Sequence, residues 1–544
     1  MNSLLKKTKD FIFAQQTSIL SSTLILSGMM ILSRLAGFLR HRILLGNFTK
    51  EELDIFLAAF RIPDLVFEIL INGALSTTFI PFFIEYQRKE KEQGRIVSSI
   101  INVVFIALFA FILLLTLLLP QLIPLITPGF AHDTEKIKQI IYYSRLLLLG
   151  QLPFLVLGNF LTGISQAKKS FLLPAIAPLI YNFAIILATL FFAPQVHLLA
   201  PVIGVILGAL LFFLIQVPVL FFVDFQYQLV ITHLNEAYRF FRTAIPRILT
   251  IIVAQIDATV DLTLATLMGS GSYTIFYLAQ TLQLLPVSII GMAMGQASLP
   301  YLADMYQEGK VKEFKNIIID SLLNILFFTI PATMFFMITR TPVVRLFYGA
   351  AKFDWEGTVL TALALFYFCF SLPLHSIYYF LTRCFYAVFD TRTPFYISLG
   401  SILLNATLSI WFTLYLKLPV WALAISFSIS MNIQVMVLFY ILYKKIDGLD
   451  VKRLFSESFR ITLAAINTSV LTYFLIRLLD GLILDTSRTL NVFLLLVIAF
   501  IFFTSFHLFL CWLFGTKELY IISKMILKAK EYQQKITVLY KGVE

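Results

Sequence analysis

Charged side chains are scarce in this 544-residue chain. Asp, Glu, Lys and Arg make up only 13% of the residues, whereas hydrophobic residues make up 59% and the mean hydropathy is +0.88. Soluble globular domains carry about 25% charged residues, so this composition excludes that class. The apolar runs are long and continuous, and the strand alternation of an outer-membrane barrel is absent. We therefore expect an all-α polytopic membrane protein.

Cysteine is also rare, and the chain lacks the usual motifs of an enzyme. Cys369, Cys384 and Cys511 fall in apolar stretches and offer neither a disulfide framework nor a metal site. The six histidines form no catalytic arrangement, and there is no Walker loop. The first apolar run lacks a cleavage pattern and is expected to be span one. These absences favour a gradient-driven transporter over an enzyme, with no cofactor and no metal.

Apolar runs separated by charged or Pro/Gly breaks predict about fourteen spans of roughly 20 residues each. Their expected centres lie near residues 30, 68, 110, 150, 182, 210, 254, 288, 325, 372, 405, 431, 468 and 502. Residues 516–544 differ, because apolar residues such as Leu519, Ile522 and Met525 recur there at helical spacing among lysines. This pattern predicts a cytoplasmic amphipathic helix on the membrane surface.

Lysine and arginine predict the orientation of the chain in its membrane. With the N-terminus inside, the cytoplasmic segments hold about 25 Lys and Arg, and the opposite loops hold about 10. Both termini are therefore expected to be cytoplasmic, as an even number of spans requires. The net charge of +12 indicates contact with anionic membrane lipid and not with nucleic acid.

A weak internal repeat relates the two halves. Pro81 corresponds to Pro300, Gly129 to Gly349 and Asn182 to Asn405, at offsets of 219, 220 and 223 residues. A six-helix repeat keeps its membrane orientation, so two parallel lobes are expected. We predict an N-terminal lobe over 1–222 and a C-terminal lobe over 223–445. Spans thirteen and fourteen (446–515) and the tail (516–544) would lie outside the repeat.

Two arginines lie inside the predicted first span. Arg34 and Arg40 are offset by about 120° around a helix, and Gly37 between them permits a bend. A charge at that depth costs about 2.5–3.5 kcal/mol on insertion scales, so such residues usually have a function. A guanidinium offers bidentate donors that match phosphate oxygens. The pair therefore suggests a site for an anion inside the bilayer.

The predicted second span carries further charges. Asp54, Arg61 and Glu68 recur every seven residues and share one face, with Asp64 close by. They are interpreted either as ion pairs that hold spans one and two together or as part of a cationic cavity for a phosphate-bearing ligand. Asn72-Gly73 interrupts this span and is a candidate hinge.

Span seven carries Arg247, Asp257 and Asp261. Arg247 near the cytoplasmic end either snorkels to the surface or adds to the cavity. Asp257 and Asp261 lie on one face, which suggests cation or proton coupling, with interhelical hydrogen bonding as the alternative; Asn405 in span eleven is a candidate partner. A structural ion pair is expected between Arg383 and Asp390.

Several motifs together resemble one family. The opening blocks Ser33-Arg34-Leu35-Ala36-Gly37-Phe38-Leu39-Arg40 and Asp54-Ile55-Phe56-Leu57-Ala58-Ala59-Phe60-Arg61-Ile62-Pro63 resemble those of the MurJ (MviN) proteins, lipid II flippases of the multidrug/oligosaccharidyl-lipid/polysaccharide exporter superfamily. Gly73-Ala74-Leu75-Ser76, Thr127-Pro128-Gly129-Phe130 and Asp390-Thr391-Arg392-Thr393-Pro394 fit the same pattern. The resemblance runs in order along nearly the whole chain.

The resemblance implies fourteen helices in two lobes and alternating access to a central cavity. The implied substrate is an undecaprenyl-diphosphate-linked disaccharide-pentapeptide, moved from the inner to the outer leaflet. Arg34, Arg40 and Asp54 match the family's cavity residues, and Asp261 and Asn405 match positions linked to a coupling cation, so coupling to sodium or membrane potential is expected. Cell-wall synthesis enzymes are candidate partners.

The chain departs from the family pattern at three positions. Phe67-Glu68 and Thr281 stand where arginines are common, and Asn72 stands where Glu is common. Arg61 and Arg247 are candidates to compensate as substrate-binding residues. Three alternatives remain open: a flippase for another polyprenyl-diphosphate-linked glycan, a drug/ion antiporter of the same superfamily, and a non-transporting cell-wall scaffold.

Overall fold

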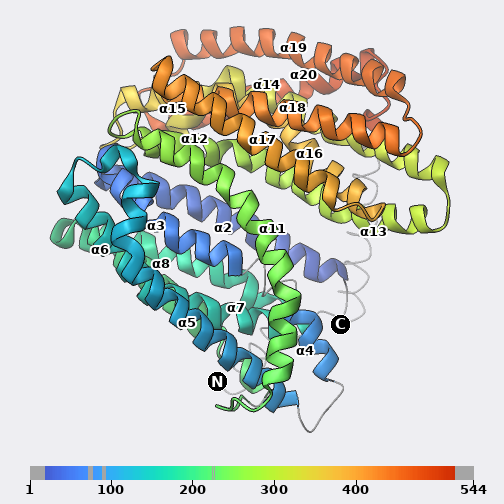
Figure 1. Ribbon diagram of the computed structural model, residues 1–544. Helices are drawn as coiled ribbons and strands as arrows, with labels where there is room; N and C mark the ends of the chain where they lie inside the picture. Colours follow the sequence, from blue (N-terminus) through green and yellow to red (C-terminus); the bar gives the residue numbers. More distant parts are fainter. Residues whose placement is uncertain are drawn as a thin grey trace, which may run out of the picture. The chain divides into compact units, whose positions relative to one another are not determined.

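The computed structural model describes residues 19–70, 78–87, 93–168, 170–222, 225 and 227–520 (Figure 1), and every regular element in these ranges is a helix. The first half contains α2 (Ile19–Asn47), α3 (Lys50–Leu70), α4 (Ile80–Gln87), α5 (Gln93–Ile126), the short 3₁₀ helix η2 (Pro128–Phe130), α6 (Thr134–Gly150), α7 (Leu152–Ala167), α8 (Leu172–Val196), α9 (Leu199–Leu214) and α10 (Val219–Phe222). The second half contains α11 (Leu234–Thr266), α12 (Ser272–Pro286), the π-helix η3 (Val287–Met292), α13 (Ala293–Gln307), α14 (Val311–Tyr348), α15 (Trp355–Cys369), α16 (Leu372–Ala387), α17 (Arg392–Ile410), the π-helix η4 (Trp411–Tyr415), α18 (Trp421–Lys445), α19 (Val451–Leu482) and α20 (Thr489–Leu513).

The predicted all-α membrane fold is confirmed. Within the described ranges, nine helical stretches are long and apolar enough to cross a membrane, and the bent pair α15–α16 makes a tenth. The other four predicted span centres lie in α2, α3, α9 and α11. Of these, α9 has only 16 residues, and α3 and α11 carry several charges. All fourteen predicted centres therefore fall in a helix or at the break of a broken one. The tail beyond Tyr520 lies outside the described residues.

The predicted repeat of about 220 residues recurs in the helix boundaries. α7 and α16 each have 16 residues and begin with Leu-Pro, and their first residues are Leu152 and Leu372. α8 and α17 begin at Leu172 and Arg392. Spans four and ten are both broken just before their Leu-Pro step, because proline removes a backbone donor and clashes with the preceding turn. These two pairs of helices therefore begin at positions that are both 220 residues apart.

Spans two and eight both contain π-helical residues. α12 and α13 are separated by the π-helix η3, and residues 78–79 before α4 form a π-turn as well. Pro81 and Pro300 follow these breaks. In span eight, an added Cβ on Gly291 would lie 2.6 Å from Ser376 Cα, and one on Gly295 would lie 2.8 Å from the carbonyl oxygen of Tyr379. These glycines let the broken helix pack closely on α16.

By its contacts the chain divides into two compact units. The first spans Met1–Ile275 and Phe347–Gly357, and the second spans Phe276–Leu346 and Thr358–Glu544. α11 thus belongs to the first unit, although the repeat assigns it to the C-terminal lobe. Contacts group residues by packing, whereas a repeat groups them by sequence, so the predicted lobe boundaries stay a prediction.

In the first unit, α2 packs on α8 and α8 packs on α9. Gly204 and Gly208 bring the backbones of α8 and α9 together, since an added Cβ on Gly204 would lie 2.7 Å from Ile185 Cα. In the second unit, α17 packs on α18 and α19 packs on α20 (Figure 1). Span fourteen packs on α14, where the ring of Phe335 meets those of Phe500 and Phe503 of α20 edge-on.

α11 is attached to the rest of the first unit at several points along its length. Arg239 forms a 2.8 Å ion pair with Glu85 of α4. Two turns before the end of α11, the Thr259 hydroxyl oxygen accepts a 2.7 Å hydrogen bond from Arg61 of α3. At its far end, the Thr266 hydroxyl accepts from the backbone N–H of Gly129, 3.1 Å away. These contacts explain why the first helix of the second half belongs to the first unit.

Candidate functional site

The two arginines of α2 have different surroundings. Arg34 is exposed, and it has no hydrogen-bond or ion-pair partner among the residues that the structure describes. Arg40, less than two turns later, is half-buried. Its Nη1 donates a 3.0 Å hydrogen bond to Oδ1 of Asn182, and its Nη2 lies 3.1 Å from Nε2 of His41. One guanidinium is therefore open to a ligand and the other is held in place.

Asn182 of α8 is the residue that holds Arg40. Its amide nitrogen donates to the carbonyl of Pro178 at 3.0 Å and lies 3.5 Å from the hydroxyl of Ser33. The Ser33 contact lies on α2 beside Arg34. In the sequence, Asn182 served only as a marker of the internal repeat. Its role could have been predicted from its position, because a polar side chain at the centre of an apolar helix needs a partner inside the membrane.

Arg61 acts mainly as a structural link. Its guanidinium lies on the inner side of α3, with 8% of the residue exposed. It donates to Thr259 at 2.7 Å and to the backbone carbonyl of Gln255 at 3.3 Å, and it lies 3.9 Å from the Asp64 carboxylate. As the ion-pairing interpretation predicted, Arg61 links two helices. The linked helices are α3 and α11, however, and not α3 and α2. A substrate-binding role for Arg61 stays a prediction.

Asp54 is also engaged within the protein. The residue is 1% exposed, and its carboxylate accepts hydrogen bonds from the backbone N–H of Gly271 at 2.6 Å and of Thr274 at 2.8 Å, and from the Thr274 hydroxyl at 2.8 Å. These donors lie in the first turn of α12 and the residue just before it. A carboxylate satisfies the unpaired N–H groups at a helix start and suits the local dipole. Asp54 therefore anchors the start of span eight, and its predicted contact with substrate is untested.

The candidate hinges are described only in part. α2 is one continuous helix through Gly37, and an added Cβ there would meet no atom within 4 Å. Packing therefore does not require glycine at this position, and its role as a hinge stays a prediction. Asn72 and Gly73 lie outside the described residues.

The candidate coupling residues lie in α11 and α17. Asp261 and Asn405 are both 1% exposed. Asp261 belongs to the first compact unit and Asn405 to the second, where the Ser409 hydroxyl lies 3.5 Å from its Oδ1. Arg247 and Asp257 are residues of α11 whose side chains are outside the described part of the structure. Their predicted roles stay predictions.

The predicted ion pair between Arg383 and Asp390 is wrong. Asp390 instead forms a 2.5 Å ion pair with Lys445 at the end of α18, and Arg383 lies over the ring of Tyr386. Partial burial works to raise the pKa of Asp390, but hydrogen bonds from Lys445 and Thr393 outweigh it and lower that pKa to about 2. The spacing of seven placed both residues near one helix end, but a lysine 55 residues away provides the closer cation.

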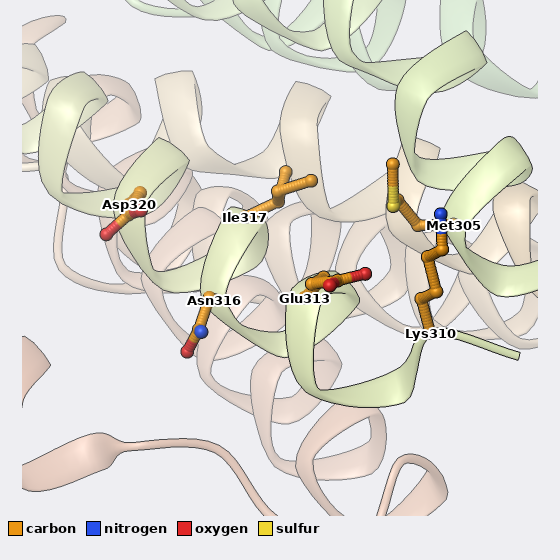
Figure 2. A pocket seen from close by; sticks show the side chains of 6 residues that line it. All are labelled: Met305, Lys310, Glu313, Asn316, Ile317 and Asp320. Carbon is orange, nitrogen blue, oxygen red and sulfur yellow. The ribbon is translucent and has the colours of Figure 1, made fainter.

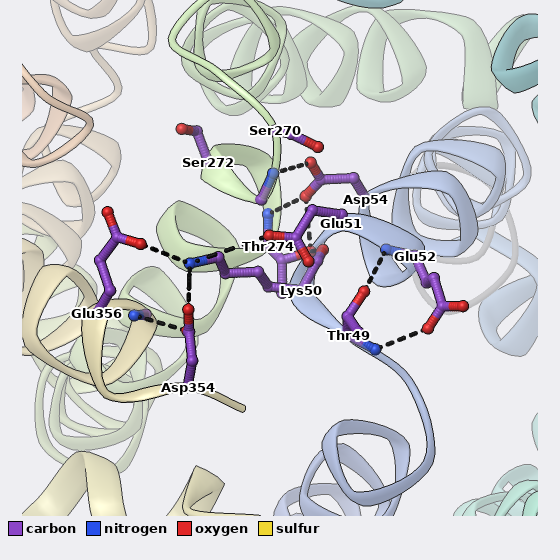
Figure 3. Close-up of polar contacts among 12 residues, drawn as sticks. Thr49, Lys50, Glu51, Glu52, Asp54, Ser270, Ser272, Thr274, Asp354 and Glu356 are labelled. Atoms are coloured by element: carbon purple, nitrogen blue, oxygen red, sulfur yellow. Dashed lines mark hydrogen bonds and ion pairs between the residues drawn. The ribbon is translucent and has the colours of Figure 1, made fainter. Parts of the chain in front are cut away.

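A second polar cluster was not predicted from the sequence. Lys50, at the start of α3, is only 8% exposed in its side chain and contacts two acids, Asp354 just before α15 and Glu356 in its first turn (Figure 3). Asp54 and Thr274 lie next to it in the same view. In the sequence, a charged residue at the edge of a span is expected to lie on the surface, so nothing near Lys50 predicted this cluster.

A surface pocket of about 370 Å³ lies in the second unit and contains none of the predicted site residues (Figure 2). Its lining is polar in part and comes from the end of α13, the connection that follows and the start of α14: Met305, Lys310, Glu313, Asn316, Ile317 and Asp320. Within the described ranges, no group of three or more His, Cys, Asp or Glu side chains is placed to hold a metal ion.

Comparisons with known proteins agree with this architecture. The family model described as "Lipid II flippase MurJ" matches residues 48–522. The lipid II flippase MurJ of Burkholderia cenocepacia is 26% identical over 394 residues, which are 70% of this chain and 76% of that protein. The probable lipid II flippase MurJ of Bdellovibrio bacteriovorus is 28% identical over 399 residues, which are 72% of this chain and 76% of that protein.

Solved structures show the same fold. A structure of the lipid II flippase MurJ in an inward closed conformation superposes with a TM-score of 0.73 at 24% identity, covering 90% of this chain and 99% of that one. An inward-facing multidrug resistance transporter of the MATE family superposes with a TM-score of 0.65 at 16% identity, covering 78% of this chain and 98% of that one. Because the family model covers most of the sequence, the chain belongs to the MurJ family of lipid II flippases.

Proposed function

We propose that this protein moves lipid II from the inner to the outer leaflet by alternating access, and that Arg34 and Arg40 bind the diphosphate of the head group. The observation that carries this proposal is the difference in exposure and hydrogen bonding between the two arginines. Arg34 is exposed and without a partner among the described residues, and Arg40 is held beside it by Asn182. Family membership supplies the candidate substrate.

The physical argument concerns the cost of moving a charged head group through hydrocarbon. An unpaired charge in a low-dielectric medium is strongly disfavoured, whereas a guanidinium pairs with phosphate oxygens through short, charge-assisted hydrogen bonds. An arginine kept within a membrane helix lowers this barrier while the prenyl tail stays in lipid. A non-transporting scaffold would gain nothing from an exposed arginine at that depth.

The proposal extends to the residues around the pair. Arg61 and Arg247 are proposed to add to the cationic surface, and Asp54 is proposed to contribute to substrate binding, directly or by positioning the helices that carry the arginines. Asp261, Asp257 and Asn405 are proposed to couple transport to sodium or to the membrane potential. Buried carboxylates in membrane helices commonly serve such coupling, which supports this part of the proposal.

The proposed orientation places both termini in the cytoplasm of a bacterium, with the protein in its cytoplasmic membrane. The excess of Lys and Arg in one set of loops supports it. Contact with cell-wall synthesis enzymes is part of the proposal.

The test is a sidedness assay with purified protein in liposomes. Lipid II carrying a fluorescent head group is placed in both leaflets, and a membrane-impermeant reagent reports the fraction that exchanges. We expect exchange with lipid II, and loss of exchange in Arg34→Ala and Arg40→Ala proteins that still insert and fold. Exchange no faster than in empty liposomes would falsify the proposed function. A competing polyprenyl-diphosphate glycan that exchanges equally fast would favour the alternative substrate.

A further inference from the structure

The loop Phe347–Gly357 belongs to the first compact unit, whereas the residues before it (Phe276–Leu346) and after it (Thr358–Glu544) belong to the second. We call this segment the α14–α15 loop, although it includes the last two residues of α14 and the first turn of α15. It contacts the first unit, but both of its ends continue into the second unit along the chain. A segment of this kind must either stay attached throughout a transport cycle or detach in some part of it. Its contacts show which is feasible.

The centre of the attachment is the ammonium group of Lys50. Its Nζ lies 2.8 and 3.1 Å from the two carboxylate oxygens of Asp354 and 3.3 Å from Oε2 of Glu356 (Figure 3). The side chain of Lys50 is 8% exposed, whereas those of Asp354 and Glu356 are 51% and 74% exposed. The lysine is therefore the buried partner, and the two acids reach it from the surface.

Residues just before and within the first turn of α12 also contact Lys50. Gly271 has a φ of +85°, and an added Cβ there would lie 2.7 Å from the Lys50 side chain. The Thr274 hydroxyl contacts the backbone carbonyl of Lys50 at 2.9 Å and the Asp54 carboxylate at 2.8 Å. Lys50 is thus held between α3 and the start of α12 in addition to its contacts with the loop.

The rest of the loop is attached beside the proposed head-group site. The backbone N–H of Lys352 donates to the carbonyl of Leu45 at 3.2 Å. The ring of Phe347 lies 4.5 Å from that of Phe38, and the ring of Tyr348 lies 6.4 Å from that of His41. Phe38 and His41 flank Arg40 on α2, so the loop contacts the helix turn that carries the arginines.

We propose that Lys50 is a releasable latch that holds the α14–α15 loop on the first unit, and that transport requires this loop to detach. This inference rests on the proposed function. In the proposed orientation the latch lies on the outer side of the membrane, where a bound head group must leave. Lys50 is a positioning residue and does not touch the substrate.

The exposure of the partners makes release inexpensive. On detachment the two acids pass into water, which solvates them well, so they lose little. Lys50 stays between α3 and the start of α12, where a charge without a partner would be costly. Glu51, whose Oε1 already lies 4.0 Å from the ammonium, is in place to accept it. The Lys50 ammonium therefore has an acidic partner both when the loop is attached and when it is detached. An ordinary structural ion pair does not need a second partner.

Gly46 and Ala350 offer a direct test. An ideal Cβ on Gly46 would lie 3.9 Å from the Cβ of Ala350, and Cβ–Cβ separations near 3.8 Å suit a disulfide. The double variant Gly46→Cys/Ala350→Cys should therefore form a disulfide between α2 and the loop. The native cysteines are free and buried, so they contribute little background.

We expect the oxidised double variant to lose at least ten-fold in lipid II exchange and to recover on reduction. The two single-cysteine variants, treated with the same oxidant, should keep wild-type exchange. Exchange by the oxidised, cross-linked protein at the rate of the reduced protein would overturn the latch. Absence of exchange in the wild-type protein would instead count against the proposed function.

A second measurement needs no substrate. The single variant Ala350→Cys is labelled with a membrane-impermeant maleimide in the background of Lys50→Met, Lys50→Arg or Asp354→Asn/Glu356→Gln. We expect several-fold faster labelling with Lys50→Met and with the double acid variant, and wild-type rates with Lys50→Arg, which keeps the charge. Equal rates in all backgrounds would show that Lys50 does not hold the loop.

Discussion

Nη1 of Arg40 on α2 donates a 3.0 Å hydrogen bond to Oδ1 of Asn182 on α8. The two residues are 142 positions apart in the chain. This bond directs one of the two arginines of the proposed head-group site, whereas Arg34 is left open. The site is therefore partly ordered before a ligand arrives, which lowers the cost of binding one.

Replacing Asn182 should weaken transport more than stability. In Asn182→Ala the Arg40 guanidinium loses a charged hydrogen bond worth about 1.5–3 kcal/mol, so we expect lipid II exchange to fall about ten-fold or more. The matched control is Asn159→Ala, because that amide donates only to Leu155 of its own helix. Liposome exchange and melting temperature in detergent check both variants. Equal exchange by the two would remove Asn182 from the site.

Arg34 and Arg61 should separate function from stability. Arg34→Ala removes no contact among the described residues, so the melting temperature should stay the same while exchange is lost. Arg61→Ala removes its bonds to Thr259 and Gln255, which join α3 to α11. Interhelical hydrogen bonds in membranes contribute about 0.6–1.7 kcal/mol each, so we expect a melting temperature several degrees lower. If Arg34→Ala instead lowered the melting temperature and Arg61→Ala abolished only exchange, Arg34 would be the structural residue and Arg61 the substrate-binding one.

Gly37 is expected to serve movement and not packing. Both Gly37→Ala and Gly28→Ala fit without a clash, because neither Cβ would meet an atom within 4 Å. Alanine favours the helix over glycine by about 1 kcal/mol, so stability should not fall in either variant. If α2 bends at Gly37 during transport, only Gly37→Ala slows exchange. Equal rates for the two variants would rule out this hinge.

Asp390 should make stability depend on acid pH. Its pKa is lowered to about 2 by Lys445 and Thr393, so its contribution is complete above the ordinary Asp value and is lost as the pH falls through about 2. Because Lys445 is partly exposed, we expect only about 1 kcal/mol. Asp390→Asn should melt lower than wild type at pH 7, and the gap should narrow towards pH 2. A gap that does not change with pH would show that the charge is not its source.

Asp261 should matter for energy coupling. Its burial within α11 makes an ionised carboxylate costly, and binding of a cation would offset that cost. We expect Asp261→Asn to insert normally and to lose the dependence of exchange on a sodium gradient or on membrane potential. Each gradient is imposed separately on the same liposomes. Unchanged dependence on both would remove Asp261 from the coupling mechanism.

Much of the fold could be predicted from the sequence because its determinants are local. Each apolar run carries its own insertion signal, and the Leu-Pro steps at Leu152 and Leu372 break their helices wherever they pack. The cost of burying a charge likewise marked Arg34 and Arg40 without knowledge of any neighbour.

Pairing, by contrast, was decided only by the tertiary structure. Arg61 finds its partners 194 and 198 residues away, and Lys50 finds Asp354 at a separation of 304. A sequence presents many oppositely charged or polar residues that would satisfy each group equally well. The folded chain selects among them, because only packing decides which side chains meet. The sequence thus determined which membrane helices carry charged residues. The tertiary structure decided which of those residues are paired within the protein and which are open to a ligand.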